Sequence, residues 1–321
     1  MTPVAAVRPA GTPAVFAMGW GGALVAALVT VLTRPVTWAL GLAGFLARGG
    51  IALLALPVTV LPTPSGVQNA LGSSMSSLLF GAPSPGLLAL ITALVAGIGL
   101  LLVAGTLVGA WAERAGIRIA MDAAVDEALV GGPVPLAPVR VWRIAVVRLL
   151  GLAPVAAVLL LSLPTLYAVV YRELILPAEL RTPLVVRIFA AAPFTFAGLT
   201  VALVAGDAAA SAAVRRLLFQ PVAVPVAWLL GWWDLVRHAP RLVATSVLGL
   251  GVLALLVAPG VLAAVLGWAR VRETFMDARD PLAMVLAVVL WVAAWLGALV
   301  LAGLASALRN AAWTFTALRG G

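Results

Sequence analysis

Residues 86–112 read GLLALITALVAGIGLLLVAGTLVGAWA, and none of these side chains carries a charge. An α-helix rises about 1.5 Å per residue, so about 20 apolar residues suffice to cross a hydrocarbon core roughly 30 Å thick. Five further apolar stretches of similar length occupy residues 36–62, 147–171, 183–206, 243–267 and 282–308. The sequence therefore predicts an all-α, polytopic membrane protein with six transmembrane helices.

The overall composition supports the same class of protein. Hydrophobic residues make up 64% of the 321 positions and charged residues 10%, whereas a soluble domain carries about 25% charged residues. So few polar side chains cannot cover a globule in water, and no stretch has the mixed composition of a soluble domain. We expect a flexible tail over residues 1–14 and a single membrane domain over residues 15–321.

The positive charge comes from arginine alone, because the sequence contains no lysine and has a net charge of +9. These arginines lie beside apolar segments and not in a basic domain, so nucleic acid is not an expected partner. An arginine-only set of cations is typical of a GC-rich bacterial genome. Cysteine is absent, which excludes disulfides and thiol ligands.

The distribution of arginine predicts the orientation in the membrane. The segment 64–85 has no charge, and on a six-helix topology more arginines fall on the side opposite this segment than on its own side. The positive-inside rule then places both termini in the cytoplasm and the protein in the inner (cytoplasmic) membrane. An apolar stretch at 15–33 leaves a seven-helix alternative open.

Three similar patterns precede apolar hairpins and suggest an internal repeat over 15–130, 131–220 and 221–321. An arginine-bearing turn at Arg34, Arg140 and Arg241 leads each time into apolar sequence, at spacings of roughly a hundred residues. We interpret each unit as a short "elbow" helix in the membrane plane followed by a hairpin of two spans. On this interpretation 20–33 is an elbow, which favours six spans over seven.

The third elbow has the clearest interfacial pattern. Asp234, Arg237, His238 and Arg241 are spaced at i, i+3, i+4 and i+7, which places them on one helical face. Tryptophan and basic residues on such a helix are typical of the headgroup layer. We therefore expect anionic phospholipids as partners of Arg237, His238 and Arg241, with interfacial anchors at Trp228, Trp232 and Trp142.

Two further features concern the helices themselves. Residues 114–129 have apolar and charged faces and predict a separate amphipathic helix on the cytoplasmic side. Glycine pairs within the spans, Gly97 with Gly99 and Gly297 with Gly303, predict close helix packing.

No pattern predicts catalysis. A hydrolase needs a nucleophile, a base and an oxyanion donor, but His238 is the only histidine, and the serine-rich segment 73–77 has no base beside it. No nucleotide-binding motif or metal-ligand spacing occurs. We expect no enzyme activity, no cofactor and no metal site.

Arg48 is the most unusual charged residue, because it lies near the middle of the span 36–62 and precedes Gly49 and Gly50. An arginine at mid-membrane depth is costly unless it faces protein or water. Its partner would then be Asp207 or Glu113, Thr245 or Ser246, or backbone carbonyls near the glycines. Held by hydroxyls or carbonyls alone, Arg48 would suit an anion site, whereas a pair with Asp207 would make it a structural lock. The alternative is that the span begins after the glycines and Arg48 reaches the interface, as Arg148 and Arg187 are expected to do from span ends.

Several short segments carry a resemblance to a known group of proteins. These are LARGG at 46–50, LPTP at 61–64, RHAP at 237–240 and NAAWT at 310–314. With them the chain resembles uncharacterised six-span bacterial membrane proteins that are similar to the membrane domain of some glycerophosphodiester phosphodiesterases. The resemblance implies a helical membrane domain without assigned activity, since the histidines and acids of the catalytic barrel are absent.

Two functions remain open from the sequence. The first, which the sequence favours, is a membrane-organising or accessory subunit that contacts lipid and other membrane subunits through its elbows. The second is a transporter or lipid-handling protein with an anion site at Arg48. A cavity that reaches Arg48 would favour the second.

The orientation gives a first prediction. Because the chain lacks cysteine, single substitutions can be labelled with an impermeant thiol reagent on intact cells. We expect Ser74→Cys to be labelled from outside and Ala5→Cys to be labelled only after permeabilisation. Labelling of position 5 on intact cells would contradict the six-helix topology and support seven spans.

Overall fold

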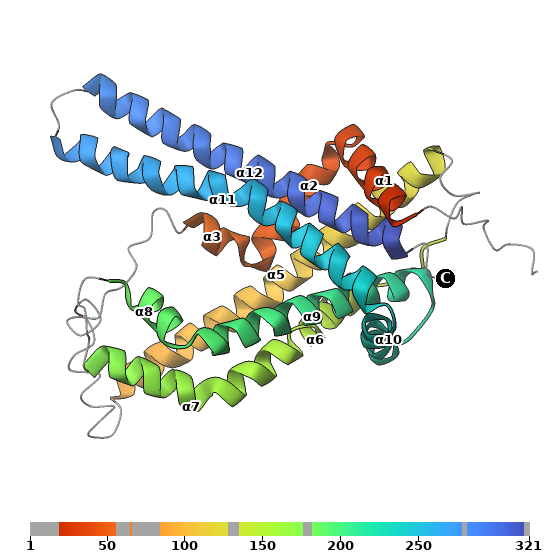
Figure 1. The fold of residues 1–321 in the computed structure, drawn as a ribbon, viewed down its shortest axis with the longest axis horizontal. Helices are drawn as coiled ribbons and strands as arrows, with labels where there is room; N and C mark the ends of the chain where they lie inside the picture. The colour runs from red at the N-terminus through yellow and green to blue at the C-terminus, as the bar shows by residue number, and fades with distance from the viewer. Residues whose placement is uncertain are drawn as a thin grey trace, which may run out of the picture.

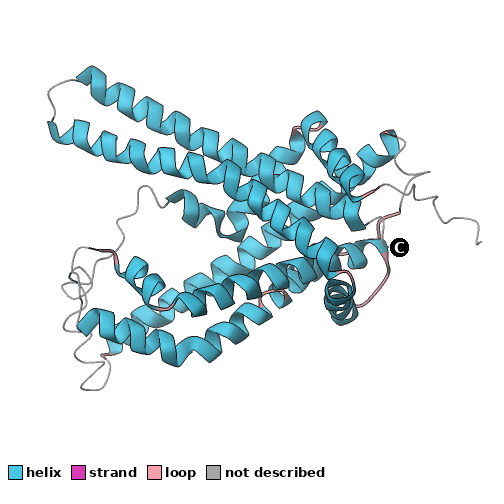
Figure 2. Cartoon of the chain, in the orientation of Figure 1, coloured by secondary structure: helices cyan, strands magenta, loops and turns pink. Residues whose placement is uncertain are grey.

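The computed structural model describes residues 19–55, 65, 84–127, 135–175, 182–277 and 281–317. Every regular element within these ranges is a helix, and the six helices long and apolar enough to cross a membrane confirm the expected class (Figure 2). The tail predicted for residues 1–14 lies outside the described residues, as does most of the segment 64–85.

The helices pack as three hairpins, each preceded by a short helix. The first hairpin is preceded by α1 (Trp20–Thr33). Its first arm consists of α2 (Val36–Phe45), the π-helical η1 (Leu46–Gly50) and α3 (Ile51–Ala55), and its second arm is α5 (Pro85–Asp126). Helix α2 packs against α5. The second contains α6 (Val141–Leu150), α7 (Ala153–Ile175), α8 (Leu184–Ala191) and α9 (Pro193–Phe219), with α7 against α9. The third contains α10 (Val224–Arg237), α11 (Ala239–Asp277) and α12 (Pro281–Ala317), with α11 against α12.

The three short helices follow one packing rule. Helix α6 packs against α5, α10 packs against α9, and α1 packs against α12. Each elbow therefore contacts the second span of the preceding unit, and the last unit closes the ring on the first. This cyclic arrangement is what a threefold internal repeat requires, while superposition of the units stays a prediction.

Burial is concentrated at one end of the bundle. In α5 the buried residues run from Gly109 to Ala124, and in α12 from Ala298 to Thr316, whereas the first halves of both helices expose leucine and valine. Figure 1 shows α11 and α12 diverging from α7 and α9 toward the left, while the elbows gather at the other end. The protein core thus lies at the end where the elbows pack, and the exposed apolar halves are suited to lipid.

Four expected boundaries were wrong. The segment 114–129 is not a separate helix, because α5 runs without interruption to Asp126. The third span covers Val141–Ile175 and so begins earlier than 147, with a break at Gly151 that separates the short helix α6 from α7. The fourth span begins at Pro193, since the residue before a proline is disfavoured in the α region and Ala192 breaks the helix. Helix α11 continues to Asp277, beyond the expected end at 267.

The glycine predictions were partly wrong. A Cβ on Gly97, Gly99 or Gly297 would meet nothing within 4 Å, so these glycines are not packing sites. A Cβ on Gly303 would lie 2.6 Å from the Trp38 carbonyl oxygen, and one on Gly41 would lie 2.2 Å from the Gly303 carbonyl oxygen. The close contact therefore joins α2 to α12, two helices from different units.

This contact gives a second prediction. Gly41→Ala should lower the free energy of unfolding in detergent by about 1–3 kcal/mol, because the new methyl group forces two backbones apart. The matched control is Gly97→Ala, which meets open space and should be neutral or slightly stabilising, since alanine favours helix more than glycine. Thermal unfolding of both variants measures the difference. Equal stability of the two would contradict the packing at Gly41.

Candidate functional site

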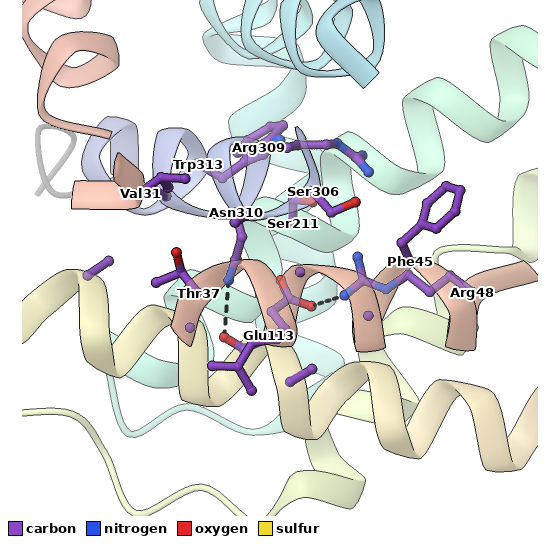
Figure 3. Close-up of a pocket in the computed structure, with 18 of the residues that line it drawn as sticks. Val31, Thr37, Phe45, Arg48, Glu113, Ser211, Ser306, Arg309, Asn310 and Trp313 are labelled. Atoms are coloured by element: carbon purple, nitrogen blue, oxygen red, sulfur yellow. Dashed lines mark hydrogen bonds and ion pairs between the residues drawn. The ribbon is translucent and has the colours of Figure 1, made fainter. Parts of the chain in front are cut away.

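A buried carboxylate, Glu113 of α5, lies at the centre of the packed end of the bundle. Its side chain is 2% exposed and accepts hydrogen bonds from arginines of three other segments. Arg48 Nη2 lies 2.8 Å from Oε2 and Arg215 Nη1 lies 2.6 Å from Oε1. Arg148 forms a two-pronged pair, with Nε 2.8 Å from Oε2 and Nη2 bonded to Oε1. Figure 3 shows Arg48 and Glu113 facing each other.

A second carboxylate, Asp207 of α9, extends the cluster. It accepts a hydrogen bond from Arg148 Nη1 at 3.2 Å and forms an ion pair with Arg309 of α12. Arg148 Nη1 also donates to Ser211 Oγ at 3.0 Å. Arg148 therefore bridges the two carboxylates and joins α6 to α5 and α9.

The local sequence explains how these groups reach the interior. Asp207, Ser211 and Arg215 recur every four residues and so share one face of α9, surrounded by the alanines of residues 208–213. Small side chains let neighbouring helices approach closely. Arg215 is thus 2% exposed, and its Nη2 donates to Asn310 Oδ1 at 2.6 Å. Asn310 in turn ties α12 to α5 through the Glu113 carbonyl oxygen at 3.4 Å.

Arg48 reaches this cluster because the helix breaks beside it. Arg48 departs from helical geometry, and Gly49 has a φ of +100°, a conformation that favours glycine. A Cβ on Gly109 would lie 3.3 Å from Arg48 Nε, so glycine there makes room for the guanidinium. The Arg48 side chain is 37% exposed and connects the buried cluster to the surface.

A cavity of about 220 Å³ opens beside the cluster. Helices α1, α2, α5, α6, α9, α11 and α12 and the π-helical turn all contribute to its wall. The charged side chains that line it are Arg48, Glu113, Arg148, Arg215 and Arg309. A water molecule takes up roughly 30 Å³ in the liquid, so several waters or one small anion would fit. Most of the cavity wall is apolar, and four of the five charged side chains in it are arginines, so its charge is mainly cationic.

Some polar groups beside the cavity have no partner among the described residues. Buried donors without a hydrogen bond there are Arg215 Nε, Arg309 Nε and the Thr30 hydroxyl. Buried polar groups normally find a partner in protein or ordered water. These three atoms are enclosed by protein, so the donors open to a ligand are those of the more exposed Arg48.

The interior placement predicted for Arg48 agrees with the structure, and Glu113 is the partner. The expectation for Arg148 and Arg187 was wrong, because both side chains are about 10% exposed and paired with carboxylates. Arg148 lies on α6, which turns it into the bundle, and Arg187 of α8 pairs with Glu173 of α7. A buried acid on a neighbouring helix gives these cations a better partner than the interface.

The third elbow is α10, which ends at Arg237. The single helical face expected for Asp234, Arg237, His238 and Arg241 was wrong, because the helix breaks at His238 and Arg241 lies on α11. Arg237 and His238 are exposed, Asp234 pairs with Arg216 at 2.9 Å, and Arg241 donates to the Thr316 carbonyl oxygen. Trp228 and Trp232 are half-buried and meet edge to face, with Trp232 packed beside Leu235 and Trp313. Trp142 is exposed. The tryptophans of α10 thus pack partly against protein, whereas Trp142 remains free to anchor in the interface.

Sequence reasoning named Glu113 and Asp207 only as possible partners of Arg48, and it missed the buried roles of Arg148, Arg215, Arg309 and Asn310. The available signal was the shared face of Asp207, Ser211 and Arg215. No group of His, Asp or Glu within the described ranges is arranged to hold a metal ion.

Comparison with known proteins adds no assignment, because no family model, curated protein or solved structure matches the chain. The resemblance to the phosphodiesterase membrane domain therefore stays a prediction.

The cluster gives a third prediction. Glu113→Gln removes the charge that three guanidinium groups share, so it should lower the unfolding free energy by about 3–5 kcal/mol. The control is Asp126→Asn, which breaks the exposed pair with Arg34 at 2.6 Å and should cost about 0–1 kcal/mol. Thermal or denaturant unfolding in detergent compares the two. A cost for Glu113→Gln as small as that of Asp126→Asn would contradict a central structural role for Glu113.

Proposed function

We propose that this integral membrane protein binds an anionic group, a phosphate or carboxylate, in the cavity beside Arg48, and that it belongs to a transporter or lipid-handling class. The observation that supports this most strongly is the cavity lined by four arginines. An arginine fork matches the geometry of phosphate and carboxylate oxygens, and a desolvated site strengthens the attraction.

The depth of the cluster fits a ligand at the headgroup level. From Pro85 to Glu113 the helix is about 42 Å long at 1.5 Å per residue, and the stretch from Pro281 to Arg309 has the same length. This exceeds a hydrocarbon core of roughly 30 Å. If both helices begin at the far face, the cluster lies in the opposite headgroup layer, where arginine is abundant on the predicted cytoplasmic side.

Arg48 is the residue best placed to meet the ligand first. Among the described residues it makes one hydrogen bond, through Nη2 to Glu113, which leaves Nε and Nη1 for a ligand. Its partial exposure gives access from outside the buried cluster. By contrast, Arg148 uses all three of its nitrogens on Glu113, Asp207 and Ser211. We therefore assign recognition to Arg48 and organisation of the site to Arg148.

The accessory-subunit function has less support from the contacts. The elbow helices α1, α6 and α10 pack against spans of their own chain. The faces that make these contacts are therefore not open to another membrane subunit. Exposed Arg237, His238 and Trp142 remain suited to lipid contact, which either function accommodates.

The fourth prediction tests the proposal. Arg48→Ala should weaken binding of an anionic lipid or of inorganic phosphate by about tenfold or more, since a hydrogen bond to a charged group is worth about 1.5–3 kcal/mol. Folding should survive, because Glu113 keeps Arg148 and Arg215. Binding is measured by native mass spectrometry for phosphatidylglycerol and by thermal shift for phosphate.

The matched control is Arg272→Ala, which removes an exposed arginine from the far end of α11. This variant should bind both probes as the unchanged protein does. If Arg48→Ala binds both probes normally and has normal stability, Arg48 does not form an anion site and the proposal fails.

A further inference from the structure

The charge balance of the cluster restricts the ligand. Arg48, Arg148, Arg215 and Arg309 supply four guanidinium groups, and Glu113 and Asp207 are the two carboxylates that pair with them among the described residues. Two positive charges are left without a counter-charge. Guanidinium groups stay protonated in proteins, so this excess is not relieved by loss of a proton.

Burial makes this excess costly. The side chains of Arg148, Arg215 and Arg309 are 10%, 2% and 16% exposed, whereas that of Arg48 is 37% exposed. One excess charge is therefore buried and the second, on Arg48, reaches the surface. Taking a charge out of water costs several kilocalories per mole unless an opposite charge compensates for it. The fold nevertheless places these arginines together around one cavity, which indicates a site completed by an anion.

The hydrogen-bond inventory agrees with the charge count. Both carboxylates are already engaged by arginines, whereas Arg48 makes one hydrogen bond among the described residues, is 37% exposed and can only donate. A ligand that fits must therefore bring acceptors and negative charge. A phosphate group supplies several strong acceptor oxygens at once.

From these observations we infer that the site selects a dianionic phosphate monoester over a monoanionic phosphodiester. The inference rests on the proposed anion-binding function and names the ligand class for that site. A phosphate monoester carries close to two negative charges at neutral pH, which matches the excess, whereas a phosphodiester would leave one positive charge uncompensated. Two sources share this dianionic phosphate chemistry: the monoester headgroup of a lipid, and inorganic phosphate, which has no ester bond.

The same charge count predicts a dependence on pH. The second pKa of a phosphate monoester is about 6, so the dianion is lost on acidification while a phosphodiester keeps its single charge. The charged groups facing the site are Arg48 from η1, Glu113 from α5, Arg148 from α6, Asp207 and Arg215 from α9 and Arg309 from α12; α1, α2 and α11 add none to the cavity wall. Arginine does not titrate in this range, so the ligand should dominate the change.

The experiment compares three probes on the full-length protein in detergent. Short-chain phosphatidic acid, phosphatidylglycerol of the same chain length and inorganic phosphate are titrated at pH 8 and at pH 5. At pH 8 we expect phosphatidic acid to bind more than about tenfold more tightly than phosphatidylglycerol, because it adds a second charge beside buried arginines. At pH 5 this preference should shrink.

The outcomes distinguish failure of the dianion inference from failure of the anion-binding function. Equal binding of both lipids at both pH values would overturn the dianion inference while the anion-binding function stands. Failure of all three probes to bind would overturn the anion-binding function itself. Tighter binding of phosphatidic acid than of inorganic phosphate identifies a lipid as the source, and equal binding identifies the free anion.

A charge variant provides a second measurement. Arg309→Gln removes one positive charge, so the preference for phosphatidic acid over phosphatidylglycerol should fall severalfold, while Asp207 keeps its pair with Arg148. Arg272→Gln, at the exposed far end of α11, should leave the preference unchanged. An unchanged preference in Arg309→Gln would contradict the inference. Should that variant not fold, the pH profile of the unchanged protein decides alone.

Discussion

The carboxylate of Glu113 and the three guanidinium groups around it are the contact on which the packed end of this bundle depends. Arg48, Arg148 and Arg215 come from three separate segments, and the buried Arg148 and Arg215 have no solvent alternative of comparable strength. Asp207 repeats the arrangement with Arg148 and Arg309. The two acids thereby hold helices from all three hairpins at one point.

Close helix packing and ion pairing occur together around Glu113 and Asp207. Glycine and alanine let the backbones of α2, α5, α9 and α12 approach closely enough for short ion pairs, as at Gly109 beside Arg48. The kink at Gly49 brings Arg48 into reach, and the break after α6 leaves Arg148 on an elbow. Because the arginines outnumber the acids, the same packing that stabilises the fold also creates a cationic cavity. Structure and proposed ligand binding therefore share one set of residues.

The cyclic packing of the elbows explains why this cavity is central. Each elbow covers the second span of the preceding unit, and Arg215 of α9 bonds to Glu113 of α5 and to Asn310 of α12, so the packed ends of these three helices are joined at the cluster. Glu113, Asp207 with Arg215, and Arg309 with Asn310 lie on these ends. Polar residues of these three helices thus meet at one site, while the other halves of α5 and α12 remain apolar and exposed.

The sequence by itself determined the membrane class, the six spans and the existence of three elbows, because hydrophobic length and turn residues act locally along the chain. It also identified Arg48 as unusual, since it is a charge within an otherwise apolar stretch, although its pair with Glu113 lies nearer the headgroup layer than mid-span. Only the tertiary structure decided that Glu113 is the partner, that Arg148 turns inward and that Gly41, not Gly97, makes a close helix contact. Those outcomes depend on which helices become neighbours, and pairs such as Glu113 with Arg215 are separated along the chain by a whole hairpin, so no local pattern encodes them.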